Sequence, residues 1–95
     1  MSRQALVEID LRPVTSIQQL HSLLEDKLEF PGWHGHNWDA FWDAITGLVE
    51  MPEKLTLIGW DEFKSRFPRD AEIMSELLSS MKEEYPEWAS EVNYI

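Results

Sequence analysis

Two short strand-like segments lie far apart in this sequence, with helical patterns between them. Residues 5–11 alternate apolar and polar side chains, whereas residues 54–59 are mostly apolar, which is typical of a strand at the centre of a sheet. Residues 91–95 form a third, weaker candidate. Because helical crossovers between successive strands favour parallel pairing, we expect an α/β fold with a small three-stranded parallel sheet packed by helices.

Four helices are predicted around these strands. Ser16 and Gln19 form a capping-box pattern at the start of the first helix. Its apolar positions at helical spacing are Ile17, Leu20, Leu23, Leu24 and Leu28. The second helix begins after an Asn37 cap and runs to about Val49, and a short third covers residues 61–67. One side of the fourth carries Ile73, Met74, Leu77, Leu78, Met81 and Tyr85. The predicted order is therefore β-α-α-β-α-α-β.

The length of the chain limits it to one compact core. A chain of 95 residues buries only about 60–65% of the surface that it exposes when unfolded, which leaves little room for a second function. No repeat, charge block or low-complexity stretch divides the sequence, and its prolines lie between the periodic segments. We expect a single domain over residues 1–95.

The charge balance favours a basic protein as partner. Acidic side chains number 18 and basic ones 8, so the net charge of −10 repels phosphates and attracts cationic surfaces. Nucleic acid is therefore a poor partner. The absence of cysteine excludes a disulfide, a thiolate nucleophile and a thiolate metal site. With no apolar run of signal-peptide or membrane-span length, we expect a soluble cytoplasmic protein.

The second predicted helix has three distinct faces. At about 100° per residue, one arc of the helix is apolar and is expected to face the core. It consists of Trp38, Phe41, Ile45, Leu48 and Val49. A narrow polar stripe consists of Asp39, Asp43, Thr46 and Glu50, with Trp42 at its boundary with the apolar arc. Small residues lie on the other side of the stripe, namely Ala40, Ala44 and Gly47.

Asp43 has no evident role in stabilising this helix. Like charges four residues apart cost a helix about 0.2–0.5 kcal/mol, and the helix dipole rewards Asp39 in the first turn but gives little to Asp43. A partner that supplies Arg, Lys or protonated His would explain the carboxylate, and the small residues beside it would let the partner's backbone approach closely. The alternative is an ordinary solvated face whose alanines favour the helix and whose Gly47 ends it.

The loop before this helix contains a candidate anchor. Trp33 stands between two glycines, where few neighbouring side chains are available to bury it. The alternative is an indole that folds back onto the core. His34 and His36 are two residues apart, His21 lies on a separate helix, and no cysteine accompanies them, which is a weak signal for zinc. We interpret His34 and His36 as solvated or rim residues and expect no metal site.

No catalytic constellation is evident in the sequence. No Ser, Cys or Lys stands beside the acids in a recognisable nucleophile setting, and no glycine loop could cradle a phosphate. Asp39 and Asp43 on adjacent turns of an exposed helix lack the burial that separates the pKa values of an acid and a base. We therefore expect a binding protein without catalytic residues or cofactors, and not an enzyme.

At residues 37–43 the chain resembles the barstar-like ribonuclease inhibitors. Asn-Trp-Asp-Ala-Phe-Trp-Asp matches their Asn-Leu-Asp-Ala-Leu-Trp-Asp helix, which also follows an aromatic-rich glycine loop. The resemblance continues through residues 44–47 and, with one small insertion near residues 50–54, through Trp60 and Phe63 to the last strand. It implies the β-α-α-β-α-α-β fold with a parallel three-stranded sheet. It also implies an intracellular inhibitor that occupies the active site of a basic secreted ribonuclease.

The resemblance further implies roles for individual residues. Trp33 corresponds to the loop aromatic that stacks on the catalytic site of the ribonuclease, and Asp43 to the acid that enters its phosphate-binding pocket. The other candidate partner-binding residues are Gly35, Asn37, Asp39, Trp42, Thr46, Gly47 and Glu83. Inhibition would be substrate mimicry, with carboxylates standing where RNA phosphates bind. Trp33, His34 and Leu48 each replace a different aromatic residue of the family pattern, which indicates a retuned partner.

Two functions remain open at this stage. The first is inhibition of a basic, barnase-type ribonuclease, either as self-protection or as immunity to a delivered nuclease toxin. In that case we expect a monomer when free and a 1:1 complex with the target, although exposed Trp33 and Trp42 could support weak self-association. The second is an acidic adaptor whose helix face docks on a different protein.

Overall fold

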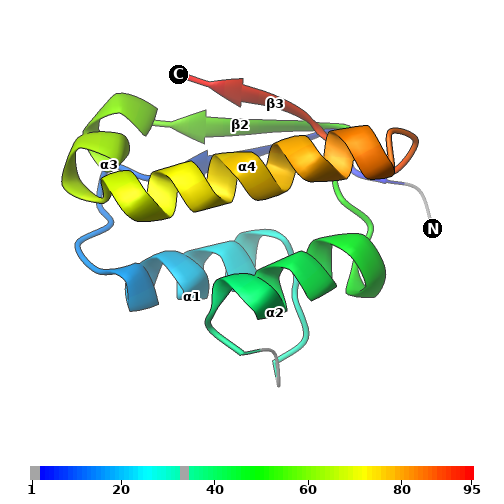
Figure 1. Ribbon diagram of the computed structural model, residues 1–95, viewed down its shortest axis with the longest axis horizontal. Helices are drawn as coiled ribbons and strands as arrows, with labels where there is room; N and C mark the ends of the chain where they lie inside the picture. Colours follow the sequence, from blue (N-terminus) through cyan, green and yellow to red (C-terminus); the bar gives the residue numbers. More distant parts are fainter. Residues whose placement is uncertain (1–2, 33–34) are drawn as a thin grey trace.

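A computed structural model describes residues 3–32 and 35–95 of the chain. The elements are β1 (Leu6–Asp10), α1 (Ile17–Lys27), α2 (Trp38–Asp43), the π-helix η1 (Ala44–Leu48), β2 (Lys54–Ile58), α3 (Trp60–Arg66), α4 (Pro68–Glu84) and β3 (Glu91–Tyr94) (Figure 1). η1 continues α2 without a break, so the predicted order of strands and helices is confirmed. No helix in the described part of the chain is both long and apolar enough to span a membrane.

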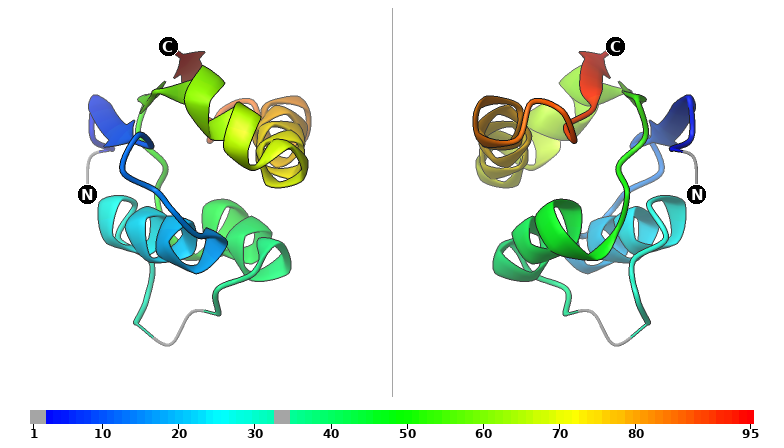
Figure 2. Two further views of the ribbon diagram at one scale, coloured as in Figure 1. Left: turned by 90° about the vertical axis from the view of Figure 1, so that its left-hand side faces the viewer. Right: turned by 90° about the vertical axis from the view of Figure 1, so that its right-hand side faces the viewer.

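The three strands form one parallel sheet with β2 at its centre. Ile9 of β1 is paired with Leu57 of β2, and Leu55 of β2 is paired with Val92 of β3. The two further views show α1, α2 and α4 on the same side of the sheet (Figure 2). The α/β fold class and the central position of the second strand are therefore as predicted.

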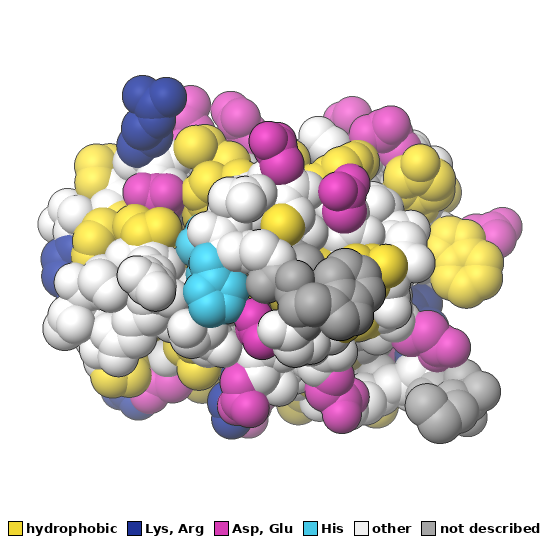
Figure 3. All heavy atoms as spheres, turned by 90° about the horizontal axis from the view of Figure 1, so that it is seen from below, with side chains coloured by type: hydrophobic (Ala, Val, Ile, Leu, Met, Phe, Trp, Pro, Cys, Tyr) yellow, Lys and Arg dark blue, Asp and Glu magenta, His cyan; other side chains and the backbone are white. Residues whose placement is uncertain are grey.

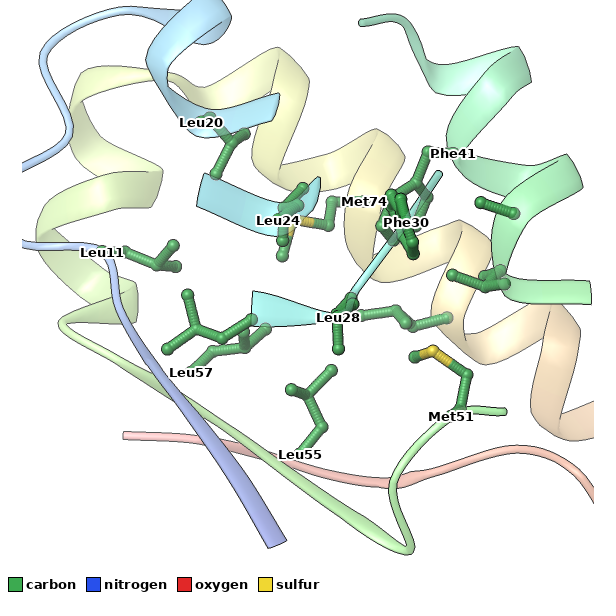
Figure 4. Close-up of a cluster of buried hydrophobic side chains, with 14 of the residues drawn as sticks. Leu11, Leu20, Leu24, Leu28, Phe30, Phe41, Met51, Leu55, Leu57 and Met74 are labelled. Carbon is green, nitrogen blue, oxygen red and sulfur yellow. The ribbon is translucent and has the colours of Figure 1, made fainter. Parts of the chain in front are cut away.

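The core lies between the sheet and these helices. Ile9, Leu55 and Leu57 of the strands are almost completely buried, because alternate residues of a strand point to the same side of the sheet. The close-up shows side chains from the sheet and from α1, α2 and α4 converging on one another (Figure 4). The labelled ones include Leu20, Leu24, Phe41, Leu55, Leu57 and Met74.

Side-chain caps start the first two helices where the sequence predicts them. The Ser16 side chain accepts a hydrogen bond from the backbone N–H of Gln19 at 3.1 Å, and Gln19 Oε1 accepts one from the backbone N–H of Thr15 at 2.8 Å. Asn37 Oδ1 accepts a hydrogen bond from the backbone N–H of Ala40 at 2.7 Å. Such caps satisfy amide groups that have no partner inside the helix.

The prediction of a regular α-helix up to about Val49 is wrong for the last turn, which is a π-helix from Ala44 to Leu48. The backbone N–H of Val49 bonds to the carbonyl of Ala44, five residues back, at 3.1 Å. A π-turn contains more residues than an α-turn, so the side chains after Ala44 fall behind their α-helical positions. Leu48, expected in the core, is therefore 43% exposed. Ala44, expected on the surface, is fully buried, whereas Phe41 and Ile45 are buried as predicted.

Candidate functional site

A groove between α2 and α4 brings acidic and apolar side chains together. It is lined by Trp38, Asp39, Trp42, Asp43, Ile73, Leu77, Ser80 and Glu84. In Figure 1, α2 and η1 lie beneath the middle and carboxyl-terminal part of α4, on the side of the molecule away from the strands. Two indoles and two aliphatic side chains provide apolar walls, and three carboxylates stand among them. Such a surface fits a side chain with an apolar stem and a cationic end.

Within residues 3–32 and 35–95, no cationic side chain pairs with the carboxylates of this groove. Asp39 and Asp43 are exposed on successive turns, and α2 and η1 contain no basic residue. Among the residues that the structure describes, the ion pairs are Arg12 with Asp10 and His36 with Glu25, so no cation pairs with Asp39, Asp43 or Glu84. A partner's cations could therefore approach these carboxylates without breaking an ion pair.

Phe41 anchors the helix that carries the two aspartates. Its ring is 1% exposed and lies at a centroid distance of 6.0 Å from Phe30 and 5.3 Å from Trp38, both in edge contacts. The Asn37 cap orders the backbone at the start of the same helix. Because Asn37 caps the start of α2 and Phe41 is buried in the core, the helix that carries Asp39 and Asp43 is held at both points.

Trp38 joins α2 to two other helices. Its indole Nε1 donates a hydrogen bond to Asp70 Oδ1 of α4 at 2.9 Å, and its ring meets that of His21 of α1 at a centroid distance of 4.6 Å. The indole is half-buried, as its position on the predicted core arc suggests. Trp38 therefore helps to hold the α2 wall of the groove against α4.

Replacing Trp38 with phenylalanine is expected to lower the free energy of unfolding by about 1–2 kcal/mol. The substitution removes the indole N–H that donates to Asp70, so the partly buried Asp70 carboxylate loses this hydrogen bond. Urea denaturation followed by circular dichroism measures this change. In a double-mutant cycle with Asp70→Ala, the second substitution should cost little once the first is present. Fully additive losses would show that this hydrogen bond does not stabilise the fold.

The loop before α2 packs against α1 through a histidine. His36 Nε2 lies 2.7 Å from Glu25 Oε2, and its ring stacks on His21 at a centroid distance of 6.3 Å. His36 is exposed at the rim, as predicted.

No group of three His, Cys, Asp or Glu side chains in residues 3–32 and 35–95 is arranged to hold a metal ion. Trp33 and His34 lie outside the described residues, so the role of Trp33 stays a prediction.

The remaining residues predicted on α2 and η1 border the groove or follow it. Trp42 is half-buried and lines the groove, and its carbonyl accepts a hydrogen bond from Thr46 Oγ1 at 2.7 Å. Gly47 is exposed, and beyond its chain neighbours and its own helix backbone a Cβ added there would meet no atom of the described residues within 4 Å. A Cβ on Gly35 would instead come within 3.3 Å of Asn37 Nδ2, so this glycine leaves room for the helix cap.

The sequence analysis missed the side of α4 that faces α2. Ile73, Leu77, Ser80 and Glu84 line the groove, at the spacings of four, three and four that mark one helix face. Glu83, the predicted contact residue of this helix, is exposed but does not line the groove. The spacing alone could have grouped Glu84 with Leu77 and Ile73. It could not have shown that this face borders Asp39 and Asp43.

Comparisons with known proteins agree on one family. A family model described as Barstar (barnase inhibitor) matches residues 4–94. A protein of Bacillus subtilis (strain 168), named "Putative ribonuclease inhibitor YrdF", is 37% identical over 81 residues, which cover 81% of this chain and 89% of that protein.

Proposed function

This chain belongs to the barstar family, and on that premise we propose that it inhibits a basic, barnase-type ribonuclease by occupying its active site. Membership of an inhibitor family agrees with the expectation that the chain is not an enzyme. The observation that carries the proposal is the groove between α2 and α4. There Asp39, Asp43 and Glu84 stand beside apolar walls and form no ion pair with any residue that the structure describes.

The chemistry of a ribonuclease active site complements this groove. An enzyme that binds RNA phosphates must present cationic side chains, and a carboxylate can take the place of a phosphate among them. We assign this role to Asp43, with Asp39 beside it on the same helix. The indole of Trp42 and the side chain of Leu77 offer apolar contact to the stems of the same cations.

The other proposed contacts surround this centre. Trp33, from the loop before α2, would stack on the catalytic site of the enzyme. The remaining proposed partner-binding residues are Gly35, Asn37, Thr46, Gly47 and Glu83. We expect a monomer that binds one molecule of ribonuclease in the cytoplasm, either to protect the producer of the enzyme or as immunity to a delivered toxin. The net charge of −10 would speed association, so the association rate should fall as salt is added.

Titration of the purified protein into barnase with a fluorogenic RNA substrate tests this function. We expect stoichiometric loss of cleavage that a higher substrate concentration partly relieves, because inhibitor and RNA compete for one site. Binding of barnase without loss of cleavage would contradict active-site blockade and would instead favour an adaptor that docks elsewhere. Complete absence of binding would contradict a barnase-type target.

Replacing Gly47 with alanine separates binding from folding. In the free protein the added methyl group points into open space among the residues that the structure describes, so the free energy of unfolding should stay the same or rise by up to about 1 kcal/mol. In the complex the methyl group would stand where the ribonuclease is expected to approach, and the inhibition constant should rise about tenfold or more. Thermal unfolding and inhibition assays of the same preparation measure both effects. Unchanged inhibition would place Gly47 outside the interface.

A further inference from the structure

A turn after α4 exposes two aromatic side chains. Tyr85 follows the last residue of α4 and is 43% exposed, and Trp88 is 60% exposed. Tryptophan is a large side chain that folded proteins usually bury to a great extent. Two exposed aromatic rings within one turn therefore indicate a surface that another molecule covers.

The turn is held in place by the amino-terminal segment. The guanidinium of Arg3 donates hydrogen bonds to the carbonyls of Glu87, Trp88 and Ala89, at 3.1, 3.3 and 3.1 Å. It also donates to the carbonyl of Met51 at 2.8 Å. Within the turn, the backbone N–H of Trp88 donates to the carbonyl of Tyr85 at 2.9 Å. A rigid turn loses little conformational entropy when its side chains are covered.

The turn begins at the end of α4 that borders the acidic groove. Glu84, the last residue of α4, lines the groove, and Tyr85 follows it directly. The right-hand view of Figure 2 shows the carboxyl-terminal end of α4, the turn and the end of η1 on the same side of the molecule. In Figure 3, hydrophobic and acidic side chains lie next to one another at the right-hand end of the molecule.

We propose that Tyr85 and Trp88 form a second anchor for the same ribonuclease and contact cationic side chains at the rim of its active site. This inference rests on the proposed function. Indole and phenol rings attract Arg and Lys side chains through their π-faces, and Glu87 places a carboxylate between the two aromatics in the sequence. Tryptophan and tyrosine are also the residues that most often dominate the energy of protein interfaces.

The charge of the chain argues against the other occupants of this surface. A second copy carries the same net charge of −10, and a nucleic acid is also negative, so both would be repelled over distance. A basic protein is attracted to the same surface. The occupant that best fits the turn is therefore the cationic protein that the groove beside it also fits.

Inhibition assays with barnase and four single variants test the inference. Trp88→Ala is expected to raise the inhibition constant about tenfold to a hundredfold, and Tyr85→Ala is expected to raise it severalfold, because each removes an aromatic ring from the interface. Both rings are exposed in the free protein, so the fold should not change. Trp88→Phe should keep most of the affinity, since a ring remains. Leu6→Ala, at a half-exposed apolar residue on β1, is the control and should leave the constant unchanged. Thermal unfolding of each variant verifies the fold.

The possible outcomes separate failure of the second anchor from failure of the proposed function. If the unaltered protein inhibits barnase and Trp88→Ala inhibits equally well, the second anchor is contradicted while the proposed function stands. If the unaltered protein does not inhibit, the proposed function fails and this inference fails with it. If sedimentation shows a dimer that Trp88→Ala abolishes without changing inhibition, the turn pairs two copies of the chain, which also contradicts the inference.

Discussion

Replacing Asp43 with alanine is expected to weaken inhibition of the ribonuclease by about 2–5 kcal/mol, a factor of about thirty or more in the inhibition constant. The carboxylate is exposed and forms no ion pair with the described part of the chain, so its loss should leave the fold intact. In the complex it would be enclosed among cations of the enzyme, and these would keep no partner once it is removed. Titration with the fluorogenic substrate measures the inhibition constant.

Two further variants separate the causes of this loss. Glu72→Ala removes the same charge from an exposed position of α4 outside the groove, and it should weaken inhibition only slightly by reducing long-range attraction. Asp43→Asn keeps the shape of the side chain and removes its charge, so it should resemble Asp43→Ala if charge is what the enzyme recognises. Similar small losses for Asp43→Ala and Glu72→Ala would contradict a dominant contact and favour diffuse attraction.

Replacing Phe41 with alanine is expected to lower the free energy of unfolding by about 3–5 kcal/mol. Its ring is 1% exposed and packs against Phe30 and Trp38, so the substitution leaves a cavity where α2 meets the core. Domains are stable by only about 5–15 kcal/mol, so this loss is a large part of the total. Inhibition should weaken as well, because the helix that presents Asp39 and Asp43 would no longer be held. Urea denaturation measures the change in stability.

Leu48→Ala is the matched control for Phe41. Both residues belong to the apolar arc expected from regular helical periodicity, but the π-turn leaves Leu48 43% exposed. Its replacement should therefore change the free energy of unfolding by no more than about 0.5 kcal/mol. If the two substitutions destabilised the protein equally, Leu48 would be a core residue and the helix would continue in α-helical form past Ala44.

Local sequence patterns predicted most of the fold and the position of α2. The alternation in β1, the continuous apolar run in β2 and the caps at Ser16 and Asn37 all depend on residues close together in the chain. Patterns of this kind also predicted that Asp39 and Asp43 would be exposed on one face of a helix. The expected burial of Leu48 was wrong, because a change from α- to π-helical bonding leaves no clear signal in hydrophobic spacing.

What the sequence by itself determined was the order of the elements, the parallel sheet, the helix caps and the acidic face of α2, since each follows from short-range periodicity or from the rule for crossover connections. Only the tertiary structure decided that Trp38 binds Asp70, that Glu84 borders Asp43, and that Arg3 holds the turn with Trp88. These pairs lie far apart in the chain. They meet because packing around one core brings α2, α4 and the amino-terminal segment together, and no local pattern encodes that packing.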